Sequence, residues 1–481
     1  MTTEPAVIDE PAHRSGLAIP AGGIRATQVG GNTVGGVIRE RAARADGYRH
    51  LDTPAMIAKL KRLHANTYLY GVWDTPVDWD DLCEEFAPAA TEAGIDIWIY
   101  LVPPTETSET GRASRPYMMD YHAWAKACAE LSVAHSSVKA WGIDDFEFNQ
   151  DLFTADYVGQ MRTIGRDINP KLGFYLCTYF SAATNEEFMD KYAPHLDAVL
   201  FPFLDGHNLN TQVASSVGPD LDAIKEHTDR RGLDLVLLVY TGRFLDAALE
   251  PTEDYAAQAV RTGLEYARAG KIAGVTAYGL QIDDAPSVVN SNRAMYGTGR
   301  LSLAVTAPRT ETGAWAEASQ VIHPDPAAAR YELSFWHFDT FNAKHGEVGR
   351  HVKQVLVDDE VVWSEDCMHH GFALWQQGST IQGPVDLTPQ LRGKSSAKLA
   401  FRLYEQTGGA NFPIDVGFDN IETIGFDVRE PGFEDPVPWT LSNSGHGLPL
   451  AAVDIWIHNR PQRIFEAVAA EYEAAEQSAR G

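Results

Sequence analysis

Short apolar runs alternate with stretches of helical length from about residue 24 to residue 283. The runs are rich in β-branched and aromatic residues and have the length of strands. Eight of them can be counted, at 24–30, 66–73, 95–102, 138–146, 171–180, 196–203, 233–240 and 272–280. Eight parallel strands, each followed by a helix, fill about 260 residues in a (β/α)8 barrel. We therefore predict a (β/α)8 TIM barrel over residues 23–295.

An open, doubly wound α/β sheet is the main alternative to this barrel. Such a sheet usually carries a glycine turn for phosphate after its first strand. The glycine-rich segment VGGNTVGG, residues 29–36, matches neither that turn nor a P-loop, and no clear helix follows it. We interpret this segment as a loop, and the barrel is the favoured fold.

The pattern changes after about residue 300, where strands and turns alternate without helical stretches. Examples are RYELSFWHFDTF, HVKQVLVDDEVVW and SAKLAFRLYEQTG. This pattern is typical of an antiparallel sandwich. We predict an all-β, jelly-roll-like sandwich of the carbohydrate-binding kind over residues 296–430. An N-terminal tail over residues 1–22 and a C-terminal extension over residues 431–481, ending in a helix, complete the predicted organisation.

The charge of the chain excludes several classes of partner. A formal net charge of -27 and a pI near 4.9 would repel nucleic acid and anionic membranes. No window approaches the roughly 18 to 20 apolar residues of a spanning helix. The start, MTTEPAVIDEPAHRSG, lacks the basic and apolar parts of a secretory signal. We expect a cytoplasmic protein, or a secreted one if a leader has been removed, and a homo-oligomer remains open.

Three carboxylates follow the fourth predicted strand in the segment AWGIDDFEFN, residues 140–149. They are Asp144, Asp145 and Glu147. In a barrel, reactive groups lie at the carboxyl ends of the strands and in the loops that follow them. The position of these three residues therefore predicts a functional site.

The small residues of this strand predict which way Asp144 points. Ala140 and Gly142 share its strand face and suit the crowded barrel axis, whereas Trp141 and Ile143 would face the helices. Asp145 is expected to begin the loop. A purely structural alternative is that one of the aspartates caps the following turn.

The predicted loops of the same face carry further side chains that could bind or attack a sugar. They are Trp73, Asp74, Tyr179, Asp205, Arg243, Tyr278 and Gln281. Two carboxyl groups in a partly dry cleft acquire separated pKa values, so that one is an acid and the other a base. Cleavage of a glycosidic bond needs that pair, and aromatic rings bind the C–H faces of sugars. We take Asp144, Asp145, Glu147 and Asp205 as catalytic candidates and the other six residues as substrate-binding candidates.

A barrel with GIDDFEF at its fourth strand and a C-terminal sandwich resembles a TIM-barrel glycoside hydrolase. The segment is similar to the GIDxDxE motif of chitinase-type hydrolases, whose last Glu is the acid. Asp145 and Glu147 stand one residue earlier than their counterparts in that motif. On a continuous strand this offset reverses the facing of Glu147 and puts the acid role in doubt. Enzymes with paired glutamates on strands four and seven are also similar, but strand seven is followed by Arg243 and no Glu.

The preferred function is therefore a glycosidase or transglycosidase that acts on an oligosaccharide or polysaccharide. The sequence indicates no organic cofactor and no metal site, since His369 and His370 lack a second clustered pair of ligands. Two alternatives remain open. One is a non-catalytic carbohydrate-binding protein, and the other is a metal-dependent sugar isomerase or lyase with its ion at the carboxylates.

Overall fold

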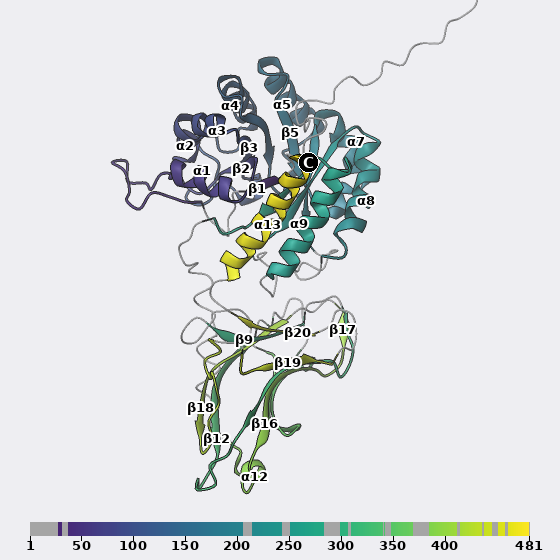
Figure 1. Cartoon of the computed structure of the whole chain (residues 1–481). Coiled ribbons are helices and arrows are strands. Elements are labelled where there is room, and N and C mark those ends of the chain that lie inside the picture. The colour runs from purple at the N-terminus through teal and green to yellow at the C-terminus, as the bar shows by residue number, and fades with distance from the viewer. Residues whose placement is uncertain are drawn as a thin grey trace, which may run out of the picture.

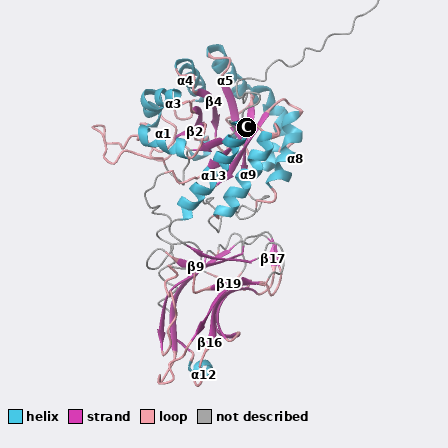
Figure 2. Cartoon of the chain, in the orientation of Figure 1, coloured by secondary structure: helices cyan, strands magenta, loops and turns pink. Residues whose placement is uncertain are grey.

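The chain forms an α/β domain and a second domain made almost entirely of strands (Figures 1 and 2). The computed structural model describes residues 27–30, 37–204, 214–242, 251–282, 299–305, 309–339, 341, 348–368, 384–410, 414–434, 437–444, 451–456 and 460–480. The predicted tail, residues 1–22, lies outside this range, as do His369 and His370.

Eight parallel strands close into a barrel. Each strand pairs with its neighbours in the sequence, and β1 also pairs with β8. The strands are β1 (Thr27–Gly30), β2 (Thr67–Val72), β3 (Asp96–Leu101), β4 (Val138–Ile143), β5 (Gly173–Cys177), β6 (Ala198–Phe203), β7 (Asp234–Tyr240) and β8 (Gly274–Tyr278). The prediction of an α/β domain of the TIM-barrel type is confirmed, and β4 is its fourth strand.

Helices surround the strands (Figure 2). They are α1 (Thr53–Arg62), α2 (Asp78–Asp81), the π-helical η1 (Leu82–Phe86), α3 (Ala87–Ala93), α4 (Tyr121–Ala134), α5 (Ala155–Ile168), α6 (Phe180–Ala183), α7 (Glu186–Tyr192), α8 (Val217–Asp229) and α9 (Glu253–Arg268). Short 3-10 turns form η2 (Pro104–Glu106), η3 (Phe146–Asn149) and η4 (Ala193–His195). The η3 turn follows β4 directly and carries the last of the three predicted carboxylates.

Strand β4 divides its side chains between two cores, as predicted. Ala140 belongs to the cluster inside the barrel, whereas Trp141 and Ile143 pack into the cluster between barrel and helices. Gly142 allows a close approach, because a Cβ at this position would lie 2.4 Å from Cε2 of Tyr175. The small residues therefore make room for large rings along the barrel axis.

The second domain is an antiparallel β-sandwich. One sheet has the order β14-β13-β16-β11-β19 and the other the order β15-β12-β18-β9-β20. The bounds are β9 (Arg300–Val305), β10 (Arg309–Thr310), β11 (Trp315–Ile322), β12 (Glu332–Asp339), β13 (His351–Val357), β14 (Glu360–Asp366), β15 (Val385–Asp386), α12 (Thr388–Leu391), β16 (Ala397–Glu405), β17 (Gly409–Ala410), β18 (Ile414–Ile424), β19 (Thr440–Asn443) and β20 (Ala451–Trp456). Aromatic rings fill the space between the sheets. The centre of the Phe401 ring lies 5.6 Å from that of Phe335 and 5.0 Å from that of Phe418.

The residues after 431 divide between the two domains. Strands β19 and β20 each join one sandwich sheet, and the last helix, α13 (Arg460–Arg480), returns to the barrel beside α9 (Figure 1). Phe465 of α13 is fully buried in the outer barrel core. Ion pairs join Arg463 to Glu253 and Arg62 to Glu466, so α13 contacts both α9 and α1.

Candidate active site

Asp144 lies just beyond the end of β4 and points toward the barrel axis, as predicted. Its N–H still donates to the carbonyl of Leu101, at 3.0 Å. The hydroxyl of Tyr100, a residue of the inner cluster, donates to Oδ1 of Asp144 at 2.6 Å. Nη2 of Arg112 lies 3.5 Å from Oδ2. Asp144 is 8% exposed, and its carboxyl group accepts hydrogen bonds.

The chain turns sharply at Asp145. This residue is left-handed, with φ 39°, and its N–H donates to Oδ1 of Asp144 at 3.1 Å. The side chain of Asn149 donates to the carbonyl of Asp145 at 2.9 Å, which fixes the η3 turn. Because the strand has already ended, strand alternation does not govern Glu147. The strand argument that the motif offset reverses the facing of Glu147 therefore does not apply to this residue.

Glu147 is a largely buried carboxyl group. Its Oε1 accepts the N–H of Tyr179 at 2.9 Å. Its Oε2 is buried and has no hydrogen-bond partner among the residues that the structure describes. Burial raises the pKa of Glu147 to about 7, against the lowering effect of the Tyr179 N–H. The acid form of Glu147 is therefore populated near neutral pH.

Asp145 is the second carboxyl group with a raised pKa. Burial and then the nearby charge of Asp144 raise the pKa of Asp145 to about 6, while a hydrogen bond from the side chain of Tyr179 opposes them. Tyr179 therefore lies near Asp145 and donates its backbone N–H to Glu147. The structure brings two carboxyl groups with different pKa values to one tyrosine.

Arg112 joins this group to the end of β2. Its guanidinium lies 4.4 Å from the ring of Trp73 and pairs with both Glu106 and Asp144. Trp73 is only 2% exposed, so its ring is covered by protein. Oδ2 of Asp74 lies 3.5 Å from Nη2 of Arg39. The pKa of Asp74 is raised, first by burial and then by the negative charge of Asp78.

Only some of the remaining predicted residues lie in the described part of the structure. The Tyr278 ring lies 5.3 Å from that of Tyr240, whose hydroxyl is 3.4 Å from the Tyr179 hydroxyl. Gln281 follows β8 and is partly buried. Asp205 and Arg243 lie outside the described residues. The described site therefore centres on β4 and β5.

Sequence reasoning missed two side chains that hold Asp144. Tyr100 occupies an inward position of its strand, and the alternation in IDIWIYLV could have pointed to it. Arg112 stands in the aperiodic loop TETSETGRASRP, where no pattern indicates its direction.

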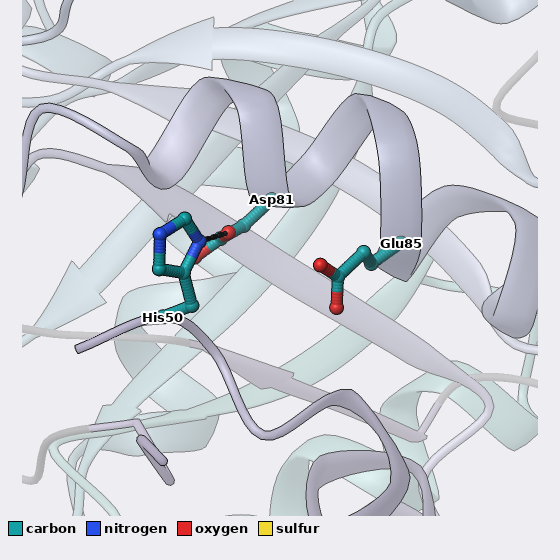
Figure 3. Close-up of side chains that lie close together, drawn as sticks. All are labelled: His50, Asp81 and Glu85. Atoms are coloured by element: carbon teal, nitrogen blue, oxygen red, sulfur yellow. Dashed lines mark hydrogen bonds and ion pairs between the residues drawn. The ribbon is translucent and has the colours of Figure 1, made fainter. Parts of the chain in front are cut away.

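A separate cluster near α1 has the chemistry of metal ligands. Atoms of His50, Asp81 and Glu85 lie within 4.8 Å of one another (Figure 3). The two ring nitrogens of His50 already face carboxylates, Nδ1 at 2.5 Å from Asp81 and Nε2 at 2.8 Å from Asp46. Glu85 pairs with Arg44 at 2.5 Å. A network of ion pairs and hydrogen bonds explains this cluster.

No helix in the described part of the chain is long and apolar enough to cross a membrane. No protein-family model matches the sequence, and no curated protein matches it either.

The solved structures to which this chain shows similarity include several glycoside hydrolases. A glucosidase of Croceicoccus marinus is 10% identical, with 85% of this chain and 98% of that chain covered and a TM-score of 0.38. β-Glucuronidase 2 of Bacteroides uniformis is 9% identical, with 81% and 65% covered and a TM-score of 0.40. An endoglucanase of Pseudomonas stutzeri is 12% identical, with 54% and 86% covered and a TM-score of 0.38. Identities this low carry no activity to another chain, so the activity must follow from the side chains.

Proposed function

We propose that this protein is a glycosidase in which Glu147 is the general acid and Asp145 is the second catalytic carboxylate. One observation carries the proposal: two carboxyl groups lie two residues apart just after β4, the Tyr179 N–H donates to Glu147, and burial raises the pKa of Asp145 to about 6 and that of Glu147 to about 7. Of the two groups, Glu147 has the higher pKa and is therefore the more protonated, and Asp145 is the more ionised. Hydrolysis of a glycosidic bond uses a pair in those two states.

In the proposed reaction, Glu147 donates its proton to the leaving oxygen as the bond between that oxygen and the anomeric carbon breaks. Asp145 either attacks the anomeric carbon or takes a proton from the attacking water. Asp144 is a positioning residue, because it accepts the Asp145 N–H and is itself held by Tyr100. Its negative charge also helps to raise the pKa of Asp145.

The finer features of the molecule are part of the same proposal. We take the barrel as a (β/α)8 barrel in which α13 occupies the place of the eighth helix, between α9 and α1. We take the sandwich as a jelly-roll-like accessory domain. The substrate is an oligosaccharide or polysaccharide, and neither a cofactor nor a metal is required.

A panel of aryl glycosides with different sugars tests this function. The wild-type protein should release the aryl group from at least one of them. Asp145→Asn should lower kcat on that substrate by about a hundredfold or more, and Glu147→Gln should do the same wherever the leaving group needs protonation, because each removes a proton-transfer or nucleophilic group. Glu109→Gln, which changes an exposed carboxylate of a neighbouring loop, should leave kcat unchanged.

Three results would count against the proposal. Full activity of both variants would remove the two carboxylates from the mechanism. Glycan binding without any product would indicate a carbohydrate-binding protein. Loss of activity after chelation would favour metal-dependent chemistry.

A further inference from the structure

A pocket of about 470 Å³ lies beside Glu147, between the η3 turn and the segment from α6 to α7. Its lining residues are Glu147, Phe148, Gln150, Ser181, Ala182, Asn185, Glu187, Phe188 and Lys191. This volume falls within the usual range of small-molecule sites, roughly 300 to 1,000 Å³. The mechanism proposed above uses only Glu147 from this set.

The wall of the pocket offers a bare aromatic face. Phe148 is 65% exposed, although it follows the half-buried Glu147 directly in the sequence. Its ring lies 6.1 Å from that of Tyr179, whose backbone N–H donates to Glu147. Covering an exposed phenylalanine ring contributes favourably to the free energy of ligand binding. The C–H faces of sugars pack well on such a ring. A sugar on Phe148 would lie beside Glu147, which also lines the pocket.

The polar groups of the pocket suit a neutral, hydroxyl-rich ligand. Oδ1 of Asn185 caps α7 by accepting the Phe188 N–H at 3.0 Å. The amide NH2 of Asn185 donates no hydrogen bond to any of the described residues. Nζ of Lys191 donates to Oε1 of Gln150 at 3.2 Å. Lys191 and Glu187 carry opposite charges, so the pocket has no net charge while Glu147 is protonated.

We propose that this pocket is the leaving-group subsite and that it binds a neutral sugar ring of the substrate on the far side of the scissile bond. The proposal rests on the glycosidase function above and adds where the departing sugar lies. The ring stacks on Phe148, and Asn185 donates to its hydroxyl groups. Glu147 is then at the junction between the pocket and the reacting bond.

Two substrates with the same reacting sugar test the subsite. One is a disaccharide or longer glycan, whose leaving sugar would fill the pocket. The other is the glycosyl fluoride, whose leaving group is too small to reach Phe148. Phe148→Ala should lower kcat/KM on the glycan about five- to tenfold, the size expected for one lost ring contact, and leave the fluoride unchanged.

Three further variants sharpen the result. Phe148→Tyr keeps the ring and should retain activity on both substrates. Asn185→Asp keeps the cap of α7 but replaces the NH2 donor, and should raise KM for the glycan alone. Tyr48→Ala removes a remote aromatic side chain that is 41% exposed, and should have no effect.

The outcomes separate the two proposals. If the wild-type protein cleaves the fluoride and the glycan but Phe148→Ala leaves both rates unchanged, the subsite is overturned and the glycosidase function stands. An equal loss on both substrates also overturns the subsite, because it indicates a structural role for Phe148. If the wild-type protein cleaves neither substrate over the panel of sugars, both proposals fail.

Discussion

At the scale of single residues, the site depends on what surrounds each carboxyl group. Asp144 accepts hydrogen bonds from Tyr100 and from the Asp145 backbone. Glu147 has a buried oxygen without a partner in the described part of the chain. Burial without full compensation favours the neutral form, so environment distinguishes these carboxyl groups. A catalytic acid in such an environment should lower the free energy of unfolding when it is ionised.

Glu147→Gln should therefore stabilise the protein in a pH-dependent way. The pKa of Glu147 rises from an ordinary 4.5 to about 7 on folding, so the folded chain loses stability as pH increases from 4.5 to 7. Above that range the loss of folding stability is constant and on the order of 3 kcal/mol. Calorimetry should show Tm higher than wild type by about 5 °C at pH 8, and no difference at pH 4.

The control for this prediction is Glu109→Gln, which should leave Tm unchanged at both pH values because Glu109 is exposed. A Tm for Glu147→Gln that is equal to or below that of wild type at pH 8 would contradict the assigned burial cost.

At the scale of elements, β4 positions the site because it leaves space inside the barrel. A Cβ on Gly142 would lie 2.4 Å from the Tyr175 ring and 2.6 Å from the Tyr175 carbonyl oxygen. The second contact is with backbone, which cannot rotate away. The close approach of β4 to β5 therefore depends on glycine at this position.

Gly142→Ala should lower Tm, with a loss of about 1 to 3 kcal/mol from overpacking. Gly165→Ala in α5 is the matched control, since its Cβ would have its nearest contact at 3.9 Å from the Ala125 carbonyl oxygen. That variant should keep or raise Tm, because alanine is favoured over glycine within a helix by about 0.5 to 1 kcal/mol. Thermal unfolding of the two variants side by side gives the answer, and an unchanged Tm for Gly142→Ala would refute this account of β4.

The elements were also what the sequence predicted best. Run 138–146 could be recognised because a strand that is buried on both faces leaves a short apolar run in the sequence, and the last strand residue, Ile143, lies within that run. The direction of Glu147 could not be predicted, since it depends on the left-handed backbone of Asp145. Nor could the placement of Arg112, which is fixed by contacts with Trp73 and Asp144 that are distant in sequence.

At the scale of the whole molecule, α13 closes the chain back onto its first domain. The helix follows the sandwich in sequence, yet Phe465, Val468 and Tyr472 are fully buried in the outer barrel core. Nζ of Lys59 lies 4.4 Å from the centre of the Phe465 ring. The amphipathic pattern predicted a helix but could not indicate its partner, because that contact spans most of the chain. The stability of the barrel should therefore depend on α13, which follows the sandwich in the sequence.

Phe465→Ala should destabilise the barrel by about 3 to 5 kcal/mol, because it opens a cavity in that core. Calorimetry should show the loss in the same transition that Gly142→Ala lowers. Glu473→Ala, on the exposed side of α13, is the control and should change Tm little. If Phe465→Ala leaves that transition in place, α13 is not part of the barrel core.

The pH dependence of kcat/KM tests the central claim most directly. It should be measured on two substrates: an ordinary glycoside, and an activated aryl glycoside whose leaving group needs no protonation. The pKa values of about 6 and about 7 predict a narrow bell on the ordinary glycoside, with activity lost below pH 6 as Asp145 is protonated and above pH 7 as Glu147 ionises. Glu147→Gln should keep activity on the activated substrate, retain the acid limb near pH 6 and lose the alkaline limb. An alkaline limb near pH 7 that persists in Glu147→Gln would contradict the assignment of Glu147 as the catalytic acid.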